Sequence, residues 1–383
     1  MQGGGEAMSV PMVLDVEESR GRRRQQRRVP PGGGGAVGRC ERCAACFSAF
    51  VNHPVIYYSV QGCRWIPVLF VAAAVFWGYY AFVFVLCFGI VGSWLERLLY
   101  MFLGHVMLCF FLWSYLKTIF TPIGRPSKQF YLPEEVQEDL TAAETLQQRH
   151  LVLDRFVRTR NLPIVTRSYD GGIRYCDKCR CVKPDRSHHC SVCGHCVLKF
   201  DHHCPWVNTC INFNNYKYFV LFLGYAMLMC ATTALIDLQY FIRFWTLQSE
   251  GGRPETSRGF HVIFLLFVSG MFSFSVSILF FYHLFLTARN RSTIESFRAP
   301  LFLYGPDAAG YNLGVVRNFR EIFGEQRRLW FLPVFSSRGD GLGFPVPVCN
   351  VEANGLLGGP RHALIAQSDS DSDDGLGSVG LQL

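Results

Sequence analysis

The stretch Trp65–Leu95, WIPVLFVAAAVFWGYYAFVFVLCFGIVGSWL, contains 31 consecutive residues without a charged side chain. About 20 apolar residues in a helix are enough to cross the hydrocarbon of a bilayer, because each residue adds about 1.5 Å. Hydrophobic residues make up 50% of the whole chain, which argues against a soluble protein of this length. The stretch therefore predicts a first membrane span.

Three further charge-free stretches follow along the chain. They are 98–116 (LLYMFLGHVMLCFFLWSYL), 218–236 (YFVLFLGYAMLMCATTALI) and 259–288 (GFHVIFLLFVSGMFSFSVSILFFYHLFLTA). Each is long enough to cross a bilayer, and four spans place both ends of the chain on the same side. Ionisable groups inside these stretches, such as His105, are few, which argues against a transporter.

Basic residues are distributed unevenly around the spans. The segment 20–28, RGRRRQQRR, precedes span one, and the long connection between spans two and three is rich in Lys and Arg. The other loops are short and less basic, so the positive-inside rule predicts that the termini and the long connection are cytosolic. The net charge of +8 is then explained by topology and by attraction to anionic lipid, and no nucleic-acid partner is expected.

The long connection contains a dense group of metal-ligating residues. Eight of the sixteen cysteines lie between Cys176 and Cys210, and in a reducing compartment such thiols bind metal rather than form disulfides. A set of four ligands recurs at an offset of 14 residues. The first set is Cys176, Cys179, His189 and Cys196, and the second is Cys190, Cys193, His203 and Cys210. This spacing predicts two interleaved Cys3His sites, each suited to a tetrahedral, structural Zn²⁺.

The same offset leaves one cysteine outside both ligand sets. Cys204 maps onto Cys190, but Val207 stands where its first partner should be, so no third metal site is complete. The spare thiol has two reactive neighbours, Asp201 and His202. A carboxylate, an imidazole and a thiol can act as orienter, base and nucleophile in thiol-based acyl transfer. The alternative is a Cys204 that only packs in the interior.

These motifs resemble those of the DHHC protein acyltransferases, the integral-membrane enzymes that S-palmitoylate proteins. The matching residues are Cys176-x-x-Cys179, Lys183-Pro184-x-Arg186-x-x-His189-Cys190, Cys193, Cys196, Asp201-His202-His203-Cys204-Pro205-Trp206 and Asn208-x-Cys210. The resemblance extends over residues 64 to 345. In detail, the sequence is most similar to the vertebrate subgroup numbered two, fifteen and twenty. It implies that Cys204 accepts an acyl chain from palmitoyl-CoA or another long-chain acyl-CoA and passes it to a protein cysteine.

The resemblance also implies structural roles outside the Cys/His segment. Ser292-Thr293-Ile294-Glu295 resembles the Thr-Thr-x-Glu of the family, so Thr293 and Glu295 are expected to be structural. Asn318 resembles an Asn that ties the C-terminal segment to the core, and an ordinary surface or cap residue is the alternative.

The acyl chain is expected, from the resemblance, to lie in an intramembrane cavity. Trp206 is assigned to its mouth, Phe219, Phe222 and Met229 to one face of span three, and Gly78 of span one to its closed end. A glycine opposite an unbranched methionine would leave room for chains of palmitoyl length or longer. Plain packing of the helix bundle is the alternative explanation for the apolar stripe on span three.

The polyanionic head of CoA is expected to meet cations outside the bilayer. Lys183, Arg186 and His188 precede the first His-His-Cys triplet and belong to neither metal set, so they are the candidates for binding its phosphates. A basic face that is only solvated is the alternative.

Two segments outside the spans are also assigned. LPEEVQEDLTAAETLQQRHLVLDRFV, residues 132–157, predicts a polar helix on the surface after Pro133. The cluster Cys40, Cys43 and Cys46 is compatible with a metal site, with acylation or with neither.

The sequence thus predicts an all-α integral membrane protein with four transmembrane helices and a cytosolic, zinc-binding, Cys-rich domain of small β-hairpins between helices two and three. The expected parts are 1–63, a disordered basic extension; 64–121, helices one and two; 122–173, a helical linker; 174–216, the Cys-rich domain; 217–289, helices three and four; 290–345, a C-terminal motif segment; and 346–383, a disordered acidic tail.

The expected function is that of a protein S-palmitoyltransferase that also acylates itself. It should hold two structural Zn²⁺, use palmitoyl-CoA as co-substrate, and act in the lipid bilayer on protein substrates with membrane-proximal cysteines. The Golgi membrane is the expected location, with endosome and plasma membrane as alternatives. A zinc-stapled membrane scaffold without catalysis is the alternative function.

Overall fold

The computed structural model describes residues 54–249 and 256–347. The chain divides into two units, Met1–Arg64 and Trp65–Leu383. In the first unit the described part holds helix α2 (Pro54–Cys63). Most of the expected N-terminal extension, with Cys40, Cys43 and Cys46, and almost all of the acidic tail lie outside the described residues.

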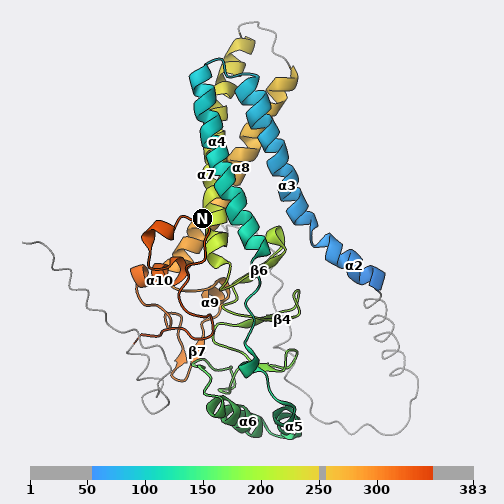
Figure 1. The fold of residues 1–383 in the computed structure, drawn as a ribbon, viewed down its shortest axis with the longest axis vertical. Helices are drawn as coiled ribbons and strands as arrows, with labels where there is room; N and C mark the ends of the chain where they lie inside the picture. The colour runs from blue at the N-terminus through green and yellow to red at the C-terminus, as the bar shows by residue number, and fades with distance from the viewer. Residues whose placement is uncertain (1–53, 250–255, 348–383) are drawn as a thin grey trace, which may run out of the picture. The chain divides into compact units, whose positions relative to one another are not determined.

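Four helical stretches in the described residues are long and apolar enough to cross a membrane, which confirms the four predicted spans. They are Gln61–Phe88, Trp94–Phe120, Tyr216–Arg243 and Gly259–Ala288. The elements that form them are α3 (Ile66–Tyr79), η2 (Tyr80–Phe88), α4 (Trp94–Phe120), α7 (Tyr216–Ser249) and α8 (Thr256–Ala288). Within the second unit, α3, α4, α7 and α8 run alongside one another, and the Cys/His domain lies at one end of them (Figure 1).

Local sequence signals explain where these helices begin and how closely they pack. Pro67 lies in the first turn of α3, where its missing N–H would have no helical partner. Ser93 caps α4 by accepting a hydrogen bond from the backbone N–H of Glu96. Gly104 of α4 faces Phe82, and a Cβ there would lie 2.7 Å from the phenyl ring. The absence of a side chain therefore allows α4 to approach the π-helical segment η2.

Of the two charged residues expected at the ends of span three, Lys217 lies at the start of its helix and Asp237 lies well inside it. Lys217 is buried in the first turn of α7, and Asp237 is fully buried further along it. The Lys217 ammonium donates to the carbonyl oxygens of Leu329 (2.7 Å) and Val334 (3.0 Å) and to Ser336 Oγ (2.7 Å). A saturated set of acceptors lets this lysine be buried at the start of the helix.

The connection between spans two and three begins with short helices. They are η3 (Lys128–Phe130), α5 (Glu134–Ala142) and α6 (Leu146–Thr159). The single surface helix predicted from the sequence is therefore wrong, because the chain breaks between α5 and α6. The cause is a capping box in which Thr145 and Gln148 satisfy each other's backbone N–H groups and start a new helix.

Three antiparallel hairpins form the Cys/His domain. They are β1 (Tyr175–Cys176) with β2 (Cys181–Val182), β3 (His188–Cys190) with β4 (His195–Val197), and β5 (His202–Cys204) with β6 (Thr209–Ile211). Small β-hairpins between the second and third spans were predicted, and the structure confirms them.

The C-terminal segment packs back onto the bundle. It contains α9 (Thr293–Phe297), the strand pair β7 (Leu301–Phe302) and β8 (Gly305–Pro306), α10 (Val315–Phe323) and η5 (Arg327–Leu329). Asn318 of α10 donates through Nδ2 to the carbonyl of Ala288 (2.8 Å) and accepts from the N–H of Leu313 (2.9 Å). This buried amide links α10 to the last residue of α8.

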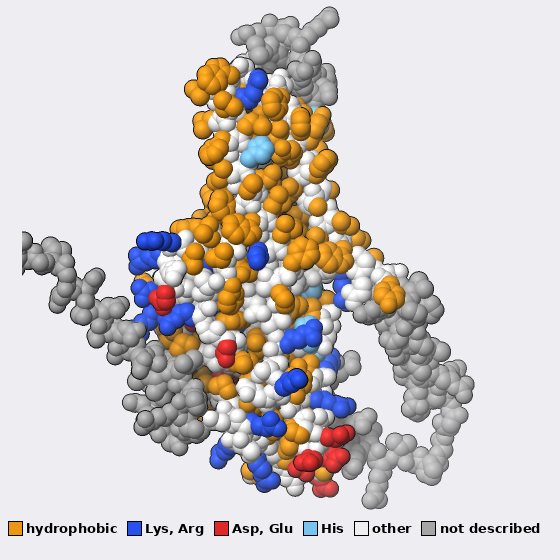
Figure 2. Space-filling model, in the orientation of Figure 1, with side chains coloured by type: hydrophobic (Ala, Val, Ile, Leu, Met, Phe, Trp, Pro, Cys, Tyr) orange, Lys and Arg blue, Asp and Glu red, His pale blue; other side chains and the backbone are white. Residues whose placement is uncertain are grey.

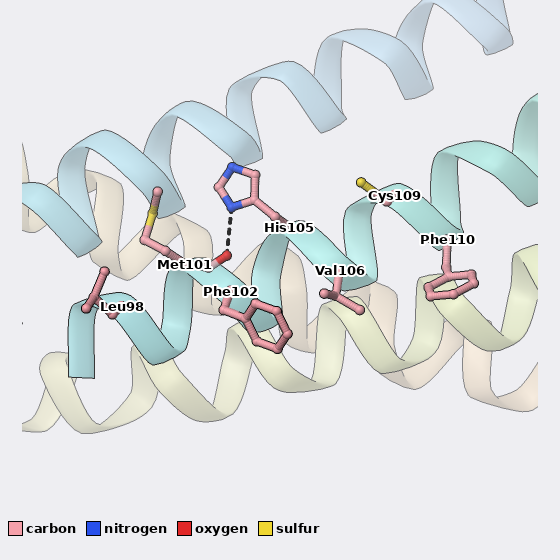
Figure 3. A pocket seen from close by; sticks show the side chains of 7 residues that line it. All are labelled: Leu98, Met101, Phe102, His105, Val106, Cys109 and Phe110. Atoms are coloured by element: carbon pink, nitrogen blue, oxygen red, sulfur yellow. Dashed lines mark hydrogen bonds between the residues drawn. The ribbon is translucent and has the colours of Figure 1, made fainter. Parts of the chain in front are cut away.

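An open hollow on the surface of α4 is the pocket drawn in Figure 3. Its lining is apolar except for His105 and Cys109. The His105 ring is already engaged, with Nδ1 2.7 Å from the carbonyl oxygen of Met101 and Nε2 3.2 Å from the Tyr79 hydroxyl. The hollow is thus lined by side chains like those that face lipid. Both ring nitrogens of its histidine are already engaged, so the hollow offers no free imidazole for catalysis.

Candidate active site

The hairpins explain how the 14-residue repeat becomes two metal centres. In the second hairpin His189 is the register partner of Cys196, and in the third hairpin His203 is the partner of Cys210. Each hairpin therefore brings a histidine and a distant cysteine opposite each other on paired strands. The Cys-x-x-Cys pair that completes each set comes from the preceding hairpin, so each metal centre would join two hairpins.

The four ligand atoms of each set converge as the spacing predicted. Within Cys176, Cys179, His189 and Cys196, and within Cys190, Cys193, His203 and Cys210, all donor atoms lie within 4.8 Å of one another. Both histidines present Nδ1 to their cysteines, at 3.2 Å from Cys179 Sγ and 3.4 Å from Cys193 Sγ. Three thiolates and one imidazole nitrogen at such distances fit a tetrahedral Zn²⁺ with bonds of about 2.0–2.3 Å. The residues present therefore fit two structural zinc ions.

Asp201 and His202 form a hydrogen-bonded pair beside Cys204. The Oδ2 atom of Asp201 lies 2.7 Å from His202 Nδ1, which leaves Nε2 of the ring for the proton of the thiol. Cys204 follows on the same strand, β5, and is buried. The arrangement can transfer a proton from sulfur to an imidazole held in one tautomer.

The charges of this pair stabilise each other in the interior. Burial disfavours the imidazolium, but hydrogen bonds and charges from Asp201 and the Cys204 thiolate outweigh it and raise the pKa of His202 to about 10, which stabilises the imidazolium that forms when the thiol gives up its proton. Burial also disfavours the carboxylate, but His202, His283 and the backbone N–H of Thr293 lower the pKa of Asp201 to about 2. Asp201 is thus an ionised orienter at neutral pH.

Thr293 orients the carboxylate of Asp201 from the other side. Its backbone N–H donates to Oδ1 (2.8 Å) and its hydroxyl donates to Oδ2 (2.7 Å). Thr293 is the first residue of α9, and the capping box of Ser292 and Glu295 fixes its backbone. The start of α9 therefore holds the Asp201 carboxylate where His202 needs it.

Two residues near the site, Tyr216 and His283, were missed by the sequence reasoning. The His202 ring packs edge-on against Phe219 (centroids 5.4 Å) and lies near the ring of His283 of α8 (6.0 Å). The Tyr216 hydroxyl is 3.1 Å from Nδ1 of His283. A lone histidine in an apolar span was the only local signal for His283, and no spacing rule connects it with residues 80 positions earlier along the chain.

Cys204 belongs to an apolar cluster at the end of the bundle. Tyr115, Val207, Phe219 and Leu223 are buried in this cluster, and Phe222 packs against it. The Tyr115 hydroxyl donates to the carbonyl oxygen of Trp206 (2.8 Å), which fixes the backbone that follows Cys204 to α4.

The remaining acyl-chain candidates are placed differently. Trp206 is half exposed, and its ring lies 6.3 Å from Phe70 of α3. Gly78 and Met229 lie further along their helices and are not members of the described apolar cluster around Cys204. The space beside Gly78 is open, since an added Cβ would meet no atom within 4 Å.

Arg186 is not placed to bind a CoA phosphate. Its guanidinium is buried, and it donates to both carboxylate oxygens of Glu295 (2.8 and 2.6 Å). It also donates to the side chain and the backbone carbonyl of Asn290, both at 2.9 Å. Burial disfavours its charge, but Glu295 and Glu321 outweigh this effect and raise the pKa of Arg186. The structure therefore corrects the expectation for this residue and gives it a structural role.

The other two expected phosphate ligands differ from each other. Burial lowers the pKa of His188 well below its usual value, and the charges of Arg174 and Lys183 add to this effect. A neutral imidazole is a poor partner for a phosphate, so His188 is a weak candidate. Lys183 is half-buried and remains the best placed of the three to meet a phosphate.

Breaking the buried pair should have a large effect on stability. Replacing Arg186 by methionine leaves the Glu295 carboxylate buried without its cation, so we expect a loss of about 3–5 kcal/mol in the free energy of unfolding. Denaturant unfolding of the detergent-solubilised protein measures this loss. Lys183→Met is the matched control and should leave the unfolding midpoint almost unchanged. An Arg186→Met protein of normal stability with a raised KM for acyl-CoA would contradict the structural role.

The fold and the site together define a class of protein. Four membrane spans carry a Cys/His-rich, metal-binding domain, and this domain presents an Asp–His–Cys group at the end of the bundle. Such an arrangement is that of a membrane-embedded, thiol-dependent acyltransferase.

Comparisons with known proteins identify the family within this class. The family model described as DHHC palmitoyltransferase matches residues 170–299. Palmitoyltransferase ZDHHC2 of Rattus norvegicus is 48% identical over 286 residues, which cover 75% of this chain and 76% of that protein. Palmitoyltransferase ZDHHC20-A of Danio rerio is 48% identical over 292 residues, covering 76% and 80%. Palmitoyltransferase ZDHHC15 of Xenopus laevis is 46% identical over 293 residues, covering 76% and 85%. The chain belongs to the DHHC palmitoyltransferase family.

Proposed function

We propose that this chain is a protein S-palmitoyltransferase in which Cys204 carries the acyl chain as a thioester between two transfers. The Asp201–His202 pair, 2.7 Å apart and adjacent to a buried thiol, is the observation that carries this proposal. Thr293 holds the carboxylate, the carboxylate holds the imidazole, and the imidazole faces the sulfur. These are the parts of an activated nucleophile.

In the first step His202 accepts the proton of Cys204, and the sulfur attacks the carbonyl carbon of the acyl-CoA thioester. A new carbon–sulfur bond forms, and the bond to the CoA sulfur breaks. His202 returns its proton to the departing CoA thiolate. In the second step the thiol of a substrate protein gives its proton to His202 and attacks the acyl-Cys204 carbonyl. The Cys204 thiolate leaves and takes the proton back, so each step balances.

The metal centres would have a structural role, which is to hold the residues of the acyl-transfer site in place. Two Zn²⁺ held by the two ligand sets would cross-link the three hairpins in tetrahedral geometry, which is what a closed Cys3His site supplies. His203 is a ligand between His202 and Cys204 in the chain. A fixed His203 therefore restricts the backbone that carries the imidazole and the thiol.

The substrates follow from the position of the site. Cys204 lies in an apolar cluster with the start of α7, so an acyl chain can reach the sulfur from the bilayer. Trp206, Phe219 and Phe222 would contact the chain near the sulfur, and the open space beside Gly78 would hold its far end against Met229. Lys183 would meet the CoA phosphates. The protein substrates would carry cysteines close to the membrane, because only these reach the end of the bundle.

We place the protein in the Golgi membrane, with its termini and Cys/His domain in the cytosol. The support for this orientation is the concentration of Lys and Arg in the N-terminal segment and in the connection between spans two and three. The support for the Golgi membrane is the resemblance to the subgroup numbered two, fifteen and twenty, with endosome and plasma membrane as the alternatives. Acyl-CoA and reduced thiols are both cytosolic chemistry, which agrees with this orientation.

A two-stage transfer assay tests the proposed function. Protein reconstituted in lipid nanodiscs is loaded with labelled palmitoyl-CoA, freed of unreacted acyl-CoA, and then mixed with a membrane-anchored peptide that has one cysteine. We expect the label to move from the enzyme to the peptide. An enzyme that never takes up label while both metal centres are filled would instead support a membrane scaffold.

The same assay, run with a mixture of acyl-CoA lengths, tests the cavity. We expect chains of palmitoyl length or longer to be preferred, and Gly78→Phe to shift the preference to shorter chains by filling the open space. Gly270→Phe is a matched control, because Gly270 of α8 also has open space around its Cα. A strong preference of the unmodified enzyme for shorter chains would rule out this account of the cavity.

A further inference from the structure

The C-terminal segment carries an exposed surface with two kinds of side chain. Its apolar members are Val315 and Val316 of α10 and Phe331 and Phe335 after η5, which are all more than half exposed. Its basic members are Arg317 of α10 and Arg327 and Arg328 of η5, which are also exposed. We call this set of seven residues the basic-aromatic surface.

The position of Phe331 places one end of this surface beside span three. The carbonyl oxygen of Phe331 accepts a hydrogen bond from the hydroxyl of Tyr225. Tyr225 lies nine residues inside the start of α7, which corresponds to about 13 Å along the helix axis. The segment that follows η5 therefore runs alongside span three, and the exposed ring of Phe331 would lie among lipids.

Basic side chains gather where the apolar region of the surface ends. Figure 2 shows blue side chains gathered on the left, at the lower limit of the region covered by hydrophobic side chains, where Figure 1 places α10. In the part of the chain that the structure describes, Arg317, Arg327 and Arg328 form no ion pair with a carboxylate. Glu325, the nearby acidic residue, is paired with Arg320 (3.6 Å) and Arg338 (2.7 Å). Among the residues that the structure describes, this surface thus has uncompensated positive charge.

The segments that carry the basic-aromatic surface pack against the apolar cluster that contains Cys204. The rings of Phe319, Phe323 and Trp330 stack on one another, with centroids 5.8–6.1 Å apart, and this joins α10 to η5. Phe323 is a member of the apolar cluster that contains Cys204, and Trp330 packs against the same cluster. The buried Lys217 ammonium fixes the loop that carries Phe331 through two of its carbonyls.

We propose that the basic-aromatic surface binds the phosphate groups of anionic phospholipids in the leaflet that adjoins the Cys/His domain. The exposed rings would enter the acyl boundary while the three guanidinium groups stay at headgroup level. Guanidinium binds phosphate in a planar, two-pronged geometry, and an arginine near an anionic membrane strengthens binding by about fivefold. Three arginines together should therefore give a preference of about a hundredfold for anionic over neutral lipid.

Native mass spectrometry of the full-length protein tests this proposal without acyl-CoA, so its outcome is independent of the acyl-transfer proposal. The protein is released from micelles that contain equal amounts of phosphatidylserine and phosphatidylcholine, and the retained lipid is identified. We expect retention of phosphatidylserine by the unmodified protein. The triple variant Arg317→Gln, Arg327→Gln, Arg328→Gln should lose about a hundredfold of this preference.

The matched control removes the same charge elsewhere. Arg155, Arg158 and Arg160 are exposed on α6 and at its end, and Figure 1 shows α6 at the opposite end of the Cys/His domain from the spans. Their triple replacement by Gln should leave lipid retention unchanged. Equal retention of both lipids by the unmodified protein would overturn the proposal, and it would point to an acidic protein partner. Loss of phosphatidylserine in the α6 variant as well would also overturn it, because net charge alone would then explain binding.

Discussion

Replacing Cys190 by serine is expected to remove one zinc ion and to unfold the Cys/His domain. Cys190 is a ligand of the second set, and its donor atom lies within 4.8 Å of the other three. A structural zinc contributes about 10–16 kcal/mol of apparent binding free energy at neutral pH, and most of that is folding free energy in a domain of short hairpins. The strands involved have two or three residues each and cannot replace this contribution by packing.

Zinc content and protease resistance of the purified variant measure this effect. The matched control is Cys204→Ser, which changes the cysteine at the equivalent position of the repeat and should keep both zinc ions. Cys181→Ser is a second control, since Cys181 is buried beside Cys196 but belongs to neither ligand set. A Cys190→Ser protein that keeps two zinc ions and resists protease would show that the ligand assignment is wrong.

Replacing Asp201 by asparagine should lower the rate of acyl-enzyme formation by about 10³- to 10⁴-fold. The amide is the same size as the carboxylate, but it carries no charge and it can present its NH₂ group to His202. The imidazole then loses the partner that fixes its tautomer and stabilises its protonated form. Asp201 is ionised in the native site and accepts hydrogen bonds from both His202 and Thr293.

Single-turnover labelling with acyl-CoA measures the effect of Asp201→Asn. Thr293→Val is the graded control, because it removes the hydroxyl that donates to Oδ2 but keeps the backbone N–H that donates to Oδ1. We expect it to slow the reaction by only about tenfold, the factor for about 1.4 kcal/mol of lost hydrogen bonding. A nearly normal rate for Asp201→Asn would mean that His202 does not need this orienter.

The spans and the metal ligands could be predicted because their signals are local and periodic. An uninterrupted apolar run needs no partner to be recognised, and the 14-residue offset between Cys176 and Cys190 survives in the hairpin register that pairs His189 with Cys196. Cys204 was singled out by the same arithmetic. In these cases residues that are regularly spaced in the sequence also take equivalent positions in the structure.

Contacts between distant segments could not be predicted in this way. Arg186 looked like a phosphate ligand because its partner, Glu295, is 109 residues away in the chain. Lys217 was correctly placed at the start of span three, but its burial could not be foreseen because its acceptors come from residues 329 to 336. Such pairs depend on how the C-terminal segment folds back on the bundle, and no local spacing records that. The sequence therefore predicted that these charged side chains contact solvent or a ligand, whereas in the structure they are buried with partners from the C-terminal segment.

Direct detection of an acyl thioester on Cys204 tests the central claim most directly. The zinc-loaded protein is incubated with an alkyne-tagged palmitoyl-CoA in the absence of any protein substrate, and the label is located by peptide mapping before and after treatment with neutral hydroxylamine. We predict a hydroxylamine-labile label on the peptide that contains Cys204, and no label there in the Cys204→Ser protein with both zinc ions bound. A label of normal yield on Cys204→Ser, or an unlabelled Cys204 in active, zinc-loaded enzyme, would contradict the account.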